Sequence, residues 1–133
     1  MEVQEGPGWR LVVDPQRQPF PVLIGGEAWA AEWTASEAIT LRRGLLQLLD
    51  QLKQLADQLM PEESITLEAE LPCPPGDLWM ELEGRPSAWQ LRFVLTPGPT
   101  RRALEGAWGL DASWAMVAAL EQCPLLDQLA AGA

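Results

Sequence analysis

The chain has 133 residues, of which 47% are hydrophobic, and its 19 acidic and nine basic residues give a net charge of −10. This length and apolar content predict one folded domain, residues 1–133, and the acidity works against binding to nucleic-acid backbones or anionic membranes. The chain has no histidine, the commonest general base and metal ligand, so we expect neither an enzyme nor a metal or cofactor site.

The sequence predicts a cytoplasmic protein in a reducing environment. Residues 1–5 are acidic, unlike the start of a signal peptide, and no apolar run approaches the length of a transmembrane helix. Cys73 and Cys123 are the only cysteines, and their spacing is not that of a zinc site. A disulfide between them is an alternative that depends on their distance.

Three segments of the N-terminal half have strand character, and they cover residues 9–13, 21–24 and 28–33. Gly25 and Gly26 predict a hairpin turn between the second and third of these strands. Residues 2–8 and 14–19 are two candidate places for a fourth strand.

A long helix is predicted over residues 35–59. Thr34 and Glu37 have the spacing of a capping box, and Pro61 is expected to end the helix. Leucines spaced by four and three residues predict one buried side, made of Leu41, Leu45, Leu48, Leu52 and Leu55. Such spacing also suits a coiled coil, but the apolar stripe is wider than a strict seam and favours a helix lying across a sheet.

The C-terminal half predicts four more strands, over residues 65–71, 78–83, 89–95 and 102–108. Asp111 is expected to cap a second helix, which Pro124 closes or kinks, and residues 125–133 are expected to form a ragged helix end. Strands with one apolar side indicate an α+β fold, an antiparallel sheet of seven to eight strands with two helices on one face.

One pattern occurs twice: a strand that ends at a tryptophan, Trp33 or Trp108, turns directly into a helix. It predicts a pseudo-twofold repeat of strands, helix, strands and helix, with halves at residues 1–60 and 61–133. If the halves are copies of one unit, we expect Trp33 and Trp108 to occupy equivalent positions in the sheet.

A second pattern is spread over most of the chain and comprises residues 8–10 and 20–27 with Trp29, Glu32, Glu105, Gly106 and Trp108. In this pattern the chain resembles an uncharacterised family of small cyanobacterial proteins. The resemblance implies a fold similar to the PC4/Whirly class of single-stranded-DNA-binding transcriptional regulators, in which a helix from one four-stranded half packs across the other half. None of these residues is a recognised catalytic signature.

Seven tryptophans are many for one small core, and the sequence favours an interaction or adaptor domain that binds another protein. Trp9, Trp79 and Trp114 are predicted to be less buried than the rest, and partly exposed tryptophans often anchor interfaces. The alternative is that all seven belong to the core or its rim. The partner is unknown, and both a monomer and a homodimer remain open.

Nucleic-acid binding is the alternative function, and its candidate contacts are Arg92, Arg101 and Arg102. The outward side of the predicted sheet opposes it, because Glu68, Glu70, Glu81 and Glu83 would repel phosphates there. These carboxylates are also a conceivable site for Mg²⁺ or Ca²⁺, although a solvated acidic face is the simpler explanation. We therefore expect no nucleic-acid partner and no membrane partner.

Overall fold

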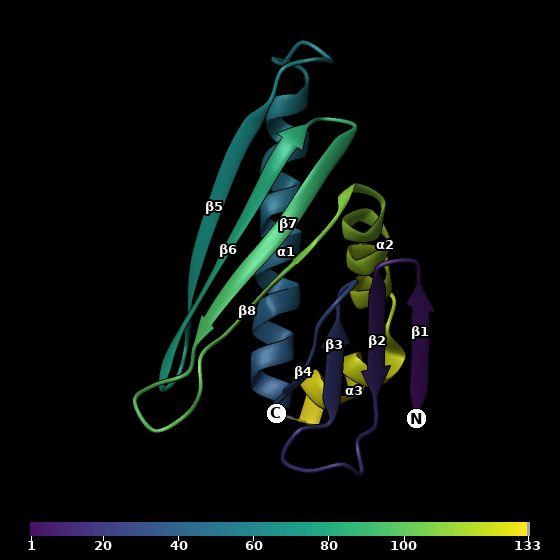
Figure 1. Ribbon diagram of the computed structural model, residues 1–133, viewed down its shortest axis with the longest axis vertical. Helices are drawn as coiled ribbons and strands as arrows, with labels where there is room; N and C mark the ends of the chain where they lie inside the picture. The colour runs from purple at the N-terminus through teal and green to yellow at the C-terminus, as the bar shows by residue number, and fades with distance from the viewer. Residues whose placement is uncertain (133) are drawn as a thin grey trace.

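The computed structural model describes residues 1–132, which fold into two four-stranded antiparallel sheets and three helices (Figure 1). The first sheet contains, in spatial order, β1 (Glu2–Gly6), β2 (Trp9–Val13), β3 (Val22–Gly25) and β4 (Ala30–Trp33). The second contains, in spatial order, β5 (Ile65–Cys73), β6 (Gly76–Arg85), β7 (Ala88–Thr96) and β8 (Leu104–Trp108). The helices are α1 (Ala35–Ala56), α2 (Leu110–Glu121) and α3 (Pro124–Gly132).

The α+β class predicted from the sequence is confirmed, but the prediction of one continuous sheet is wrong. Within residues 1–132, no ladder joins the edge strands β4 and β8. Two side-chain hydrogen bonds link the sheets instead. Trp29 Nε1 donates to the Ala107 carbonyl at 3.0 Å, and Trp108 Nε1 donates to the Gly25 carbonyl at 3.0 Å. Side chains therefore connect the two sheets across the gap between their edges.

An aromatic cluster fills the junction between the sheets. Trp29 and Trp33 from the first half meet Phe93 and Trp108 from the second, with ring centroids 5.0 to 5.6 Å apart. Trp33 and Trp108 are both buried, each at the end of the strand that precedes a helix. Each half thus has four strands followed by a helix, whereas the twofold superposition of the halves stays a prediction.

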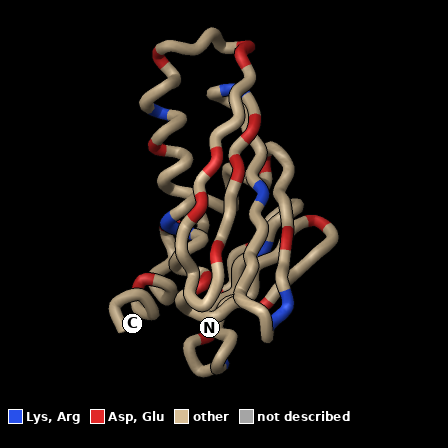
Figure 2. The backbone as a smooth tube through the Cα atoms, turned by 90° about the vertical axis from the view of Figure 1, so that its left-hand side faces the viewer, with Lys and Arg blue, Asp and Glu red and all other residues tan. Residues whose placement is uncertain are grey.

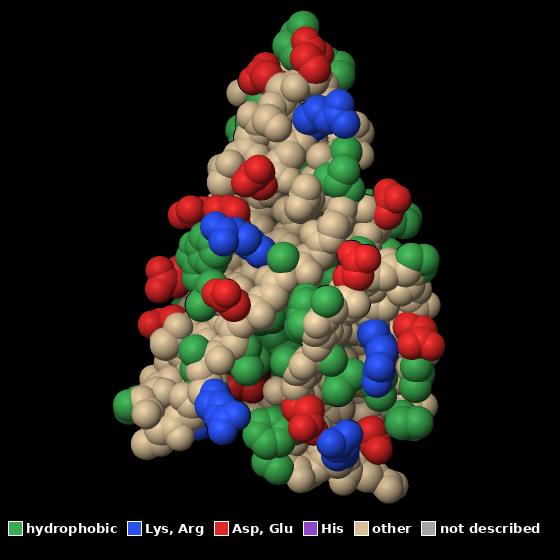
Figure 3. Space-filling model, viewed as in Figure 1, with side chains coloured by type: hydrophobic (Ala, Val, Ile, Leu, Met, Phe, Trp, Pro, Cys, Tyr) green, Lys and Arg blue, Asp and Glu red, His purple; other side chains and the backbone are tan. Residues whose placement is uncertain are grey.

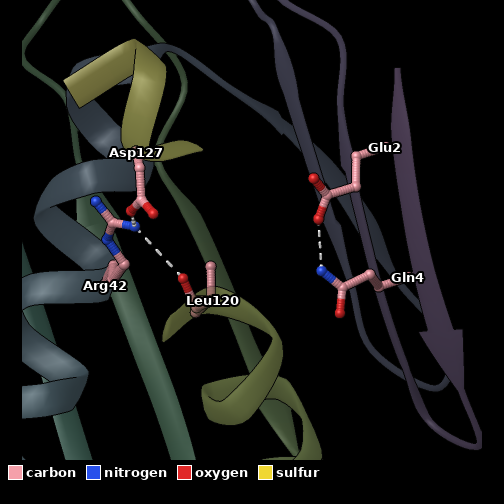
Figure 4. A network of polar contacts seen from close by, with 5 residues as sticks. All are labelled: Glu2, Gln4, Arg42, Leu120 and Asp127. Carbon is pink, nitrogen blue, oxygen red and sulfur yellow. Dashed lines mark hydrogen bonds and ion pairs between the residues drawn. The ribbon is translucent and has the colours of Figure 1, made fainter. Parts of the chain in front are cut away.

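The fourth strand of the N-terminal half is β1, in the first of the two places considered. It pairs with β2 in an antiparallel register that places Val3 opposite Val12. Its sequence, Glu-Val-Gln-Glu-Gly, has little apolar character because the strand lies at the sheet edge and buries no residue fully. Gln4 donates to Glu2 on this strand at 2.7 Å (Figure 4).

Helix α1 begins as predicted, with a complete capping box between Thr34 and Glu37. Its buried side contains Leu41, Leu45, Leu48 and Leu52, as expected, but Leu55 is 37% exposed and the helix ends at Ala56 instead of residue 59. A straight helix has 3.6 residues per turn, so a stripe with a period of 3.5 rotates away from the core by about 20° per heptad. Leu55 is the member of the stripe that this drift carries outward.

The C-terminal helices differ from the prediction in two ways. Gly109 is the N-cap of α2, and Asp111 lies in the first helical turn, where its carboxylate still interacts favourably with the helix dipole. Pro124 opens a separate helix, α3, because proline suits the first helical position. The expected ragged end is therefore an ordered helix as far as Gly132, and Ala133 lies outside the described residues.

Arg42 links α1 to the two C-terminal helices. Its Nη1 atom donates to Asp127 Oδ1 on α3 at 2.6 Å and to the Leu120 carbonyl on α2 at 3.5 Å (Figure 4). The Arg42 side chain is only 15% exposed, whereas Asp127 is 62% exposed, so solvent screens the ion pair from the side of Asp127.

A candidate interaction surface around Trp114

The three tryptophans proposed as interaction residues occupy different environments. Trp9 and Trp79 are half-buried, and Trp9 packs against the edge of the core. Trp114 is 67% exposed on α2. Met116 and Leu120 are buried against the core, whereas Trp114 and Leu110, which is 45% exposed, lie one helical turn apart on the solvent-facing side of α2. Two large apolar side chains therefore project together from the outer face of α2.

Trp114 lies beside a hollow of about 480 Å³ whose walls come from α1, α2 and the β6–β7 turn. The second half of α1 contributes Leu49, Leu52 and Lys53, and the β6–β7 turn contributes Pro86 and Ser87. Figure 1 shows this turn standing above the start of α2. The buried ring of Trp89 forms part of the floor. The hollow is mainly apolar because it lies over the edge of the core.

Two further hollows continue this surface. The second shares Ser87, Trp89 and Trp114 with the first and adds Leu110 and Asp111. The third, of about 520 Å³, shares Leu110 and Asp111 with the second and extends along β8 to Trp29 and Pro7. We call these three adjoining hollows the Trp114 groove. It runs from the second half of α1, across the start of α2, to the junction between the two sheets.

The charged residues that line the groove are three carboxylates, Glu27, Asp111 and Glu121, and one ammonium group, Lys53. All four side chains are exposed. Among residues 1–132, the four ion pairs of the structure are formed by other side chains. The groove therefore combines apolar walls with an acidic rim whose charges are free to meet a ligand.

The outer face of the second sheet is acidic, as predicted. The strand register places Glu68 opposite Glu81 and Glu70 opposite Trp79, and Figure 2 shows acidic residues on neighbouring strands. Glu81 departs from the prediction because it is buried. Arg92 Nε donates to its Oε1 atom at 2.8 Å, and the Arg92 guanidinium lies 4.8 Å from the centre of the Trp79 ring. This hydrogen bond to Glu81 raises the pKa of Arg92.

The acidic face offers no assembled metal site: in the part of the chain that the structure describes, no three acidic, cysteine or histidine side chains gather as metal ligands would. Cys73 and Cys123 are free and buried, and burial raises the pKa of both thiols. Buried, protonated thiols are poor nucleophiles, which places these cysteines in the core and not at a reactive site.

The three arginines considered for nucleic-acid contact do not form one patch. Arg92 lines a shallow hollow with Glu81 and Glu83, whereas Arg101 and Arg102 line another, between Phe20 and Glu37. Arg101 lies 3.4 Å from the Glu37 carboxylate and 5.9 Å from the centre of the Phe20 ring. Arg102 is exposed. Two of the three positive charges are thus already engaged with a carboxylate.

Hydrophobic side chains also gather in the hollowed centre of the face shown in Figure 3, with acidic and basic side chains scattered around them. Leu110, Trp89 and Lys53 also belong to the candidate surface, although they were not predicted as parts of it. The spacing of Leu110 and Trp114, one helical turn apart, was a usable signal for an exposed apolar pair. Trp89 and Lys53 approach it only through the tertiary fold.

Comparison with known proteins identifies the family. Residues 4–123 match the family model described as Domain of unknown function (DUF1818). The chain belongs to the DUF1818 family. A solved structure from Prochlorococcus sp. NATL2A, a cyanobacterium, is 38% identical and has a TM-score of 0.80, covering 91% of this chain and 97% of that one. That protein is described as one of unknown function from the DUF155 family. No curated protein matches the chain.

The expected resemblance to a cyanobacterial family therefore has support, while the PC4/Whirly-like assignment remains a prediction. None of the helices described in residues 1–132 has the length and apolar character needed to cross a lipid bilayer.

Proposed function

We propose that this DUF1818 protein is a non-enzymatic adaptor domain that binds another protein through the Trp114 groove. One observation carries the proposal: Trp114 is 67% exposed on an ordered helix, beside an apolar hollow large enough to receive a side chain of a partner. A cytoplasmic location is part of the proposal, and the two unpaired cysteines fit a reducing compartment.

The physical argument is that α2 holds the indole of Trp114 ready for contact. Packing of Met116 and Val117 against the core fixes the helix that carries Trp114, so little backbone entropy of this protein is lost when the indole is bound. Covering exposed tryptophan and leucine surface is favourable, and tryptophans surrounded by apolar contacts are frequent hot spots of protein interfaces. The groove therefore has the composition and rigidity that such an interface requires.

Affinity capture from cells that naturally produce the protein tests this function. Trp114→Ala should remove a captured protein that the wild-type chain retains, while Trp79→Ala, a half-buried tryptophan outside the groove, should retain it. Circular dichroism checks that both variants remain folded. Identical captured proteins for the wild type and Trp114→Ala would reject the groove as the binding surface.

Single-stranded nucleic-acid binding is the second candidate, favoured by the resemblance to the PC4/Whirly class and by the order of elements, four strands and a helix in each half. Fold analogy does not by itself identify a function. The charges favour the adaptor role, because Glu68, Glu70 and Glu83 lie on the sheet face where phosphates would run, and Arg92 is already paired with Glu81.

A further inference from the structure

We infer that the ligand of the Trp114 groove is an amphipathic peptide segment of a partner protein, with two bulky apolar side chains that flank a basic one. This inference rests on the proposed function and specifies the chemistry of the partner. It follows from the order in which apolar hollows and carboxylates occur along the groove.

The apolar anchors come from the two ends of the groove. At one end, Trp114, Trp89 and Leu49 enclose the first hollow. At the other end, the third hollow lies beside Trp29 and Pro7. The middle hollow shares lining residues with both, so the three hollows adjoin, and the inferred segment crosses all three. Each end suits a large aliphatic or aromatic side chain, since burial of such a side chain is the main source of binding energy.

Asp111 is the reason for inferring a basic residue in the middle of the ligand. This aspartate lines both the middle and the third hollow, so its carboxylate stands between the two apolar ends. Glu27 borders the third hollow and Glu121 the first, and among residues 1–132 Lys53 is the one positive charge that lines the groove. A lysine or arginine in the middle of the ligand meets Asp111 directly. The net charge of −10 also attracts basic segments over a longer range.

Charge complementarity also distinguishes this ligand from other occupants. A second copy of the chain would bring another strongly acidic surface to the groove, and like charges oppose that contact. A nucleic acid would place phosphates beside Glu27, Asp111 and Glu121. A basic amphipathic peptide avoids both conflicts.

Selection of short random peptides displayed on phage, against the full chain, tests the inference. Clones that also bind Trp114→Ala are removed in a counter-selection. The retained peptides should carry two bulky apolar residues with lysine or arginine between them. Synthesised as fluorescent probes, they should bind at least about tenfold more weakly to Trp114→Ala than to the wild type. Trp79→Ala and Glu68→Gln, both outside the groove, should bind them like the wild type.

Separate measurements test whether the groove prefers a ligand with a basic residue. Asp111→Asn and Glu27→Gln should each weaken the probes about two- to tenfold, and added salt should weaken binding to the wild type more than to Asp111→Asn. A selection repeated on Asp111→Lys should lose its preference for lysine and arginine. Because Glu27 lies in a turn outside α2, its variant tests the charge without altering the helix.

The outcomes distinguish the adaptor function from the chemistry that we infer for its ligand. Peptides that depend on Trp114 but lack basic residues would overturn the inference and leave the adaptor function standing. The inference and the adaptor function would both be rejected if no selected peptide depended on Trp114 and if affinity capture gave the same proteins for the wild type and Trp114→Ala. A dimer in analytical ultracentrifugation that Trp114→Ala dissociates would assign the groove to a second copy and also overturn the inference.

Discussion

Two indole N–H groups connect the sheets of this protein at the level of single residues. Trp29 belongs to the β3–β4 turn and bonds to β8, whereas Trp108 belongs to β8 and bonds to β3. The partners lie 78 and 83 residues apart in sequence. Each bond satisfies a main-chain carbonyl at the junction, and the rings themselves pack on Phe93. Hydrogen bonding and aromatic packing therefore act at the same place.

Trp108→Phe tests the contribution of one such bond. The change leaves the Gly25 carbonyl without its donor and should lower the free energy of unfolding by about 1–3 kcal/mol, with a further loss from the smaller ring. Urea unfolding followed by circular dichroism measures it. Trp79→Phe is the matched control and should cost no more than about 0.5 kcal/mol, since Trp79 is half-buried and a phenyl ring still faces Arg92. Equal losses for both variants would show that the indole bond contributes nothing specific.

At the level of elements, α1 covers the second sheet along most of its length, and its leucine stripe supplies much of the contact. Leu48→Ala should destabilise the protein by about 2–5 kcal/mol, because the side chain is fully buried. Leu55→Ala, which removes the same atoms one heptad later, should cost clearly less, about 0.5–1.5 kcal/mol, because Leu55 is 37% exposed. Thermal and urea unfolding give both values. Similar losses at the two positions would contradict the rotation of the stripe out of the core.

The elements that the sequence predicts well are those with local signals. The capping box of Thr34 and Glu37 and the leucine spacing identify α1, and alternation identifies the strands of the second sheet. The errors arise where a distant contact decides. Glu81, expected on the outward side of the sheet, is buried by its pair with Arg92 on the neighbouring strand.

The division into two sheets was likewise beyond sequence reasoning, because it depends on how the edges of β4 and β8 meet. The candidate site was predictable only in part. The sequence predicts Trp114 as one of three less buried tryptophans, but its neighbours in the groove come from α1, the β6–β7 turn and β8. These residues become neighbours only when whole elements pack together, so the spacing of residues along the sequence does not predict their proximity.

For the whole molecule, the balance of charge predicts no useful affinity for single-stranded DNA at physiological salt. The sheet face is acidic, and the basic side chains lie in separate places. Fluorescence anisotropy with a mixed-sequence oligonucleotide checks this. Micromolar binding that weakens steeply with salt would favour the nucleic-acid function, and the double variant Arg101→Glu, Arg102→Glu should then reduce it.

The central claim is that the molecule uses its rigid two-sheet scaffold to present the Trp114 groove to another protein. Site-specific photo-crosslinking inside the native cell tests it most directly, with a photoreactive amino acid in place of Ser87, which is exposed and lines the groove beside Trp114, and, as the control, in place of Trp79. The account predicts a discrete covalent complex with another protein from position 87 and none from position 79. No adduct at position 87, or the same adducts from both positions, would contradict it.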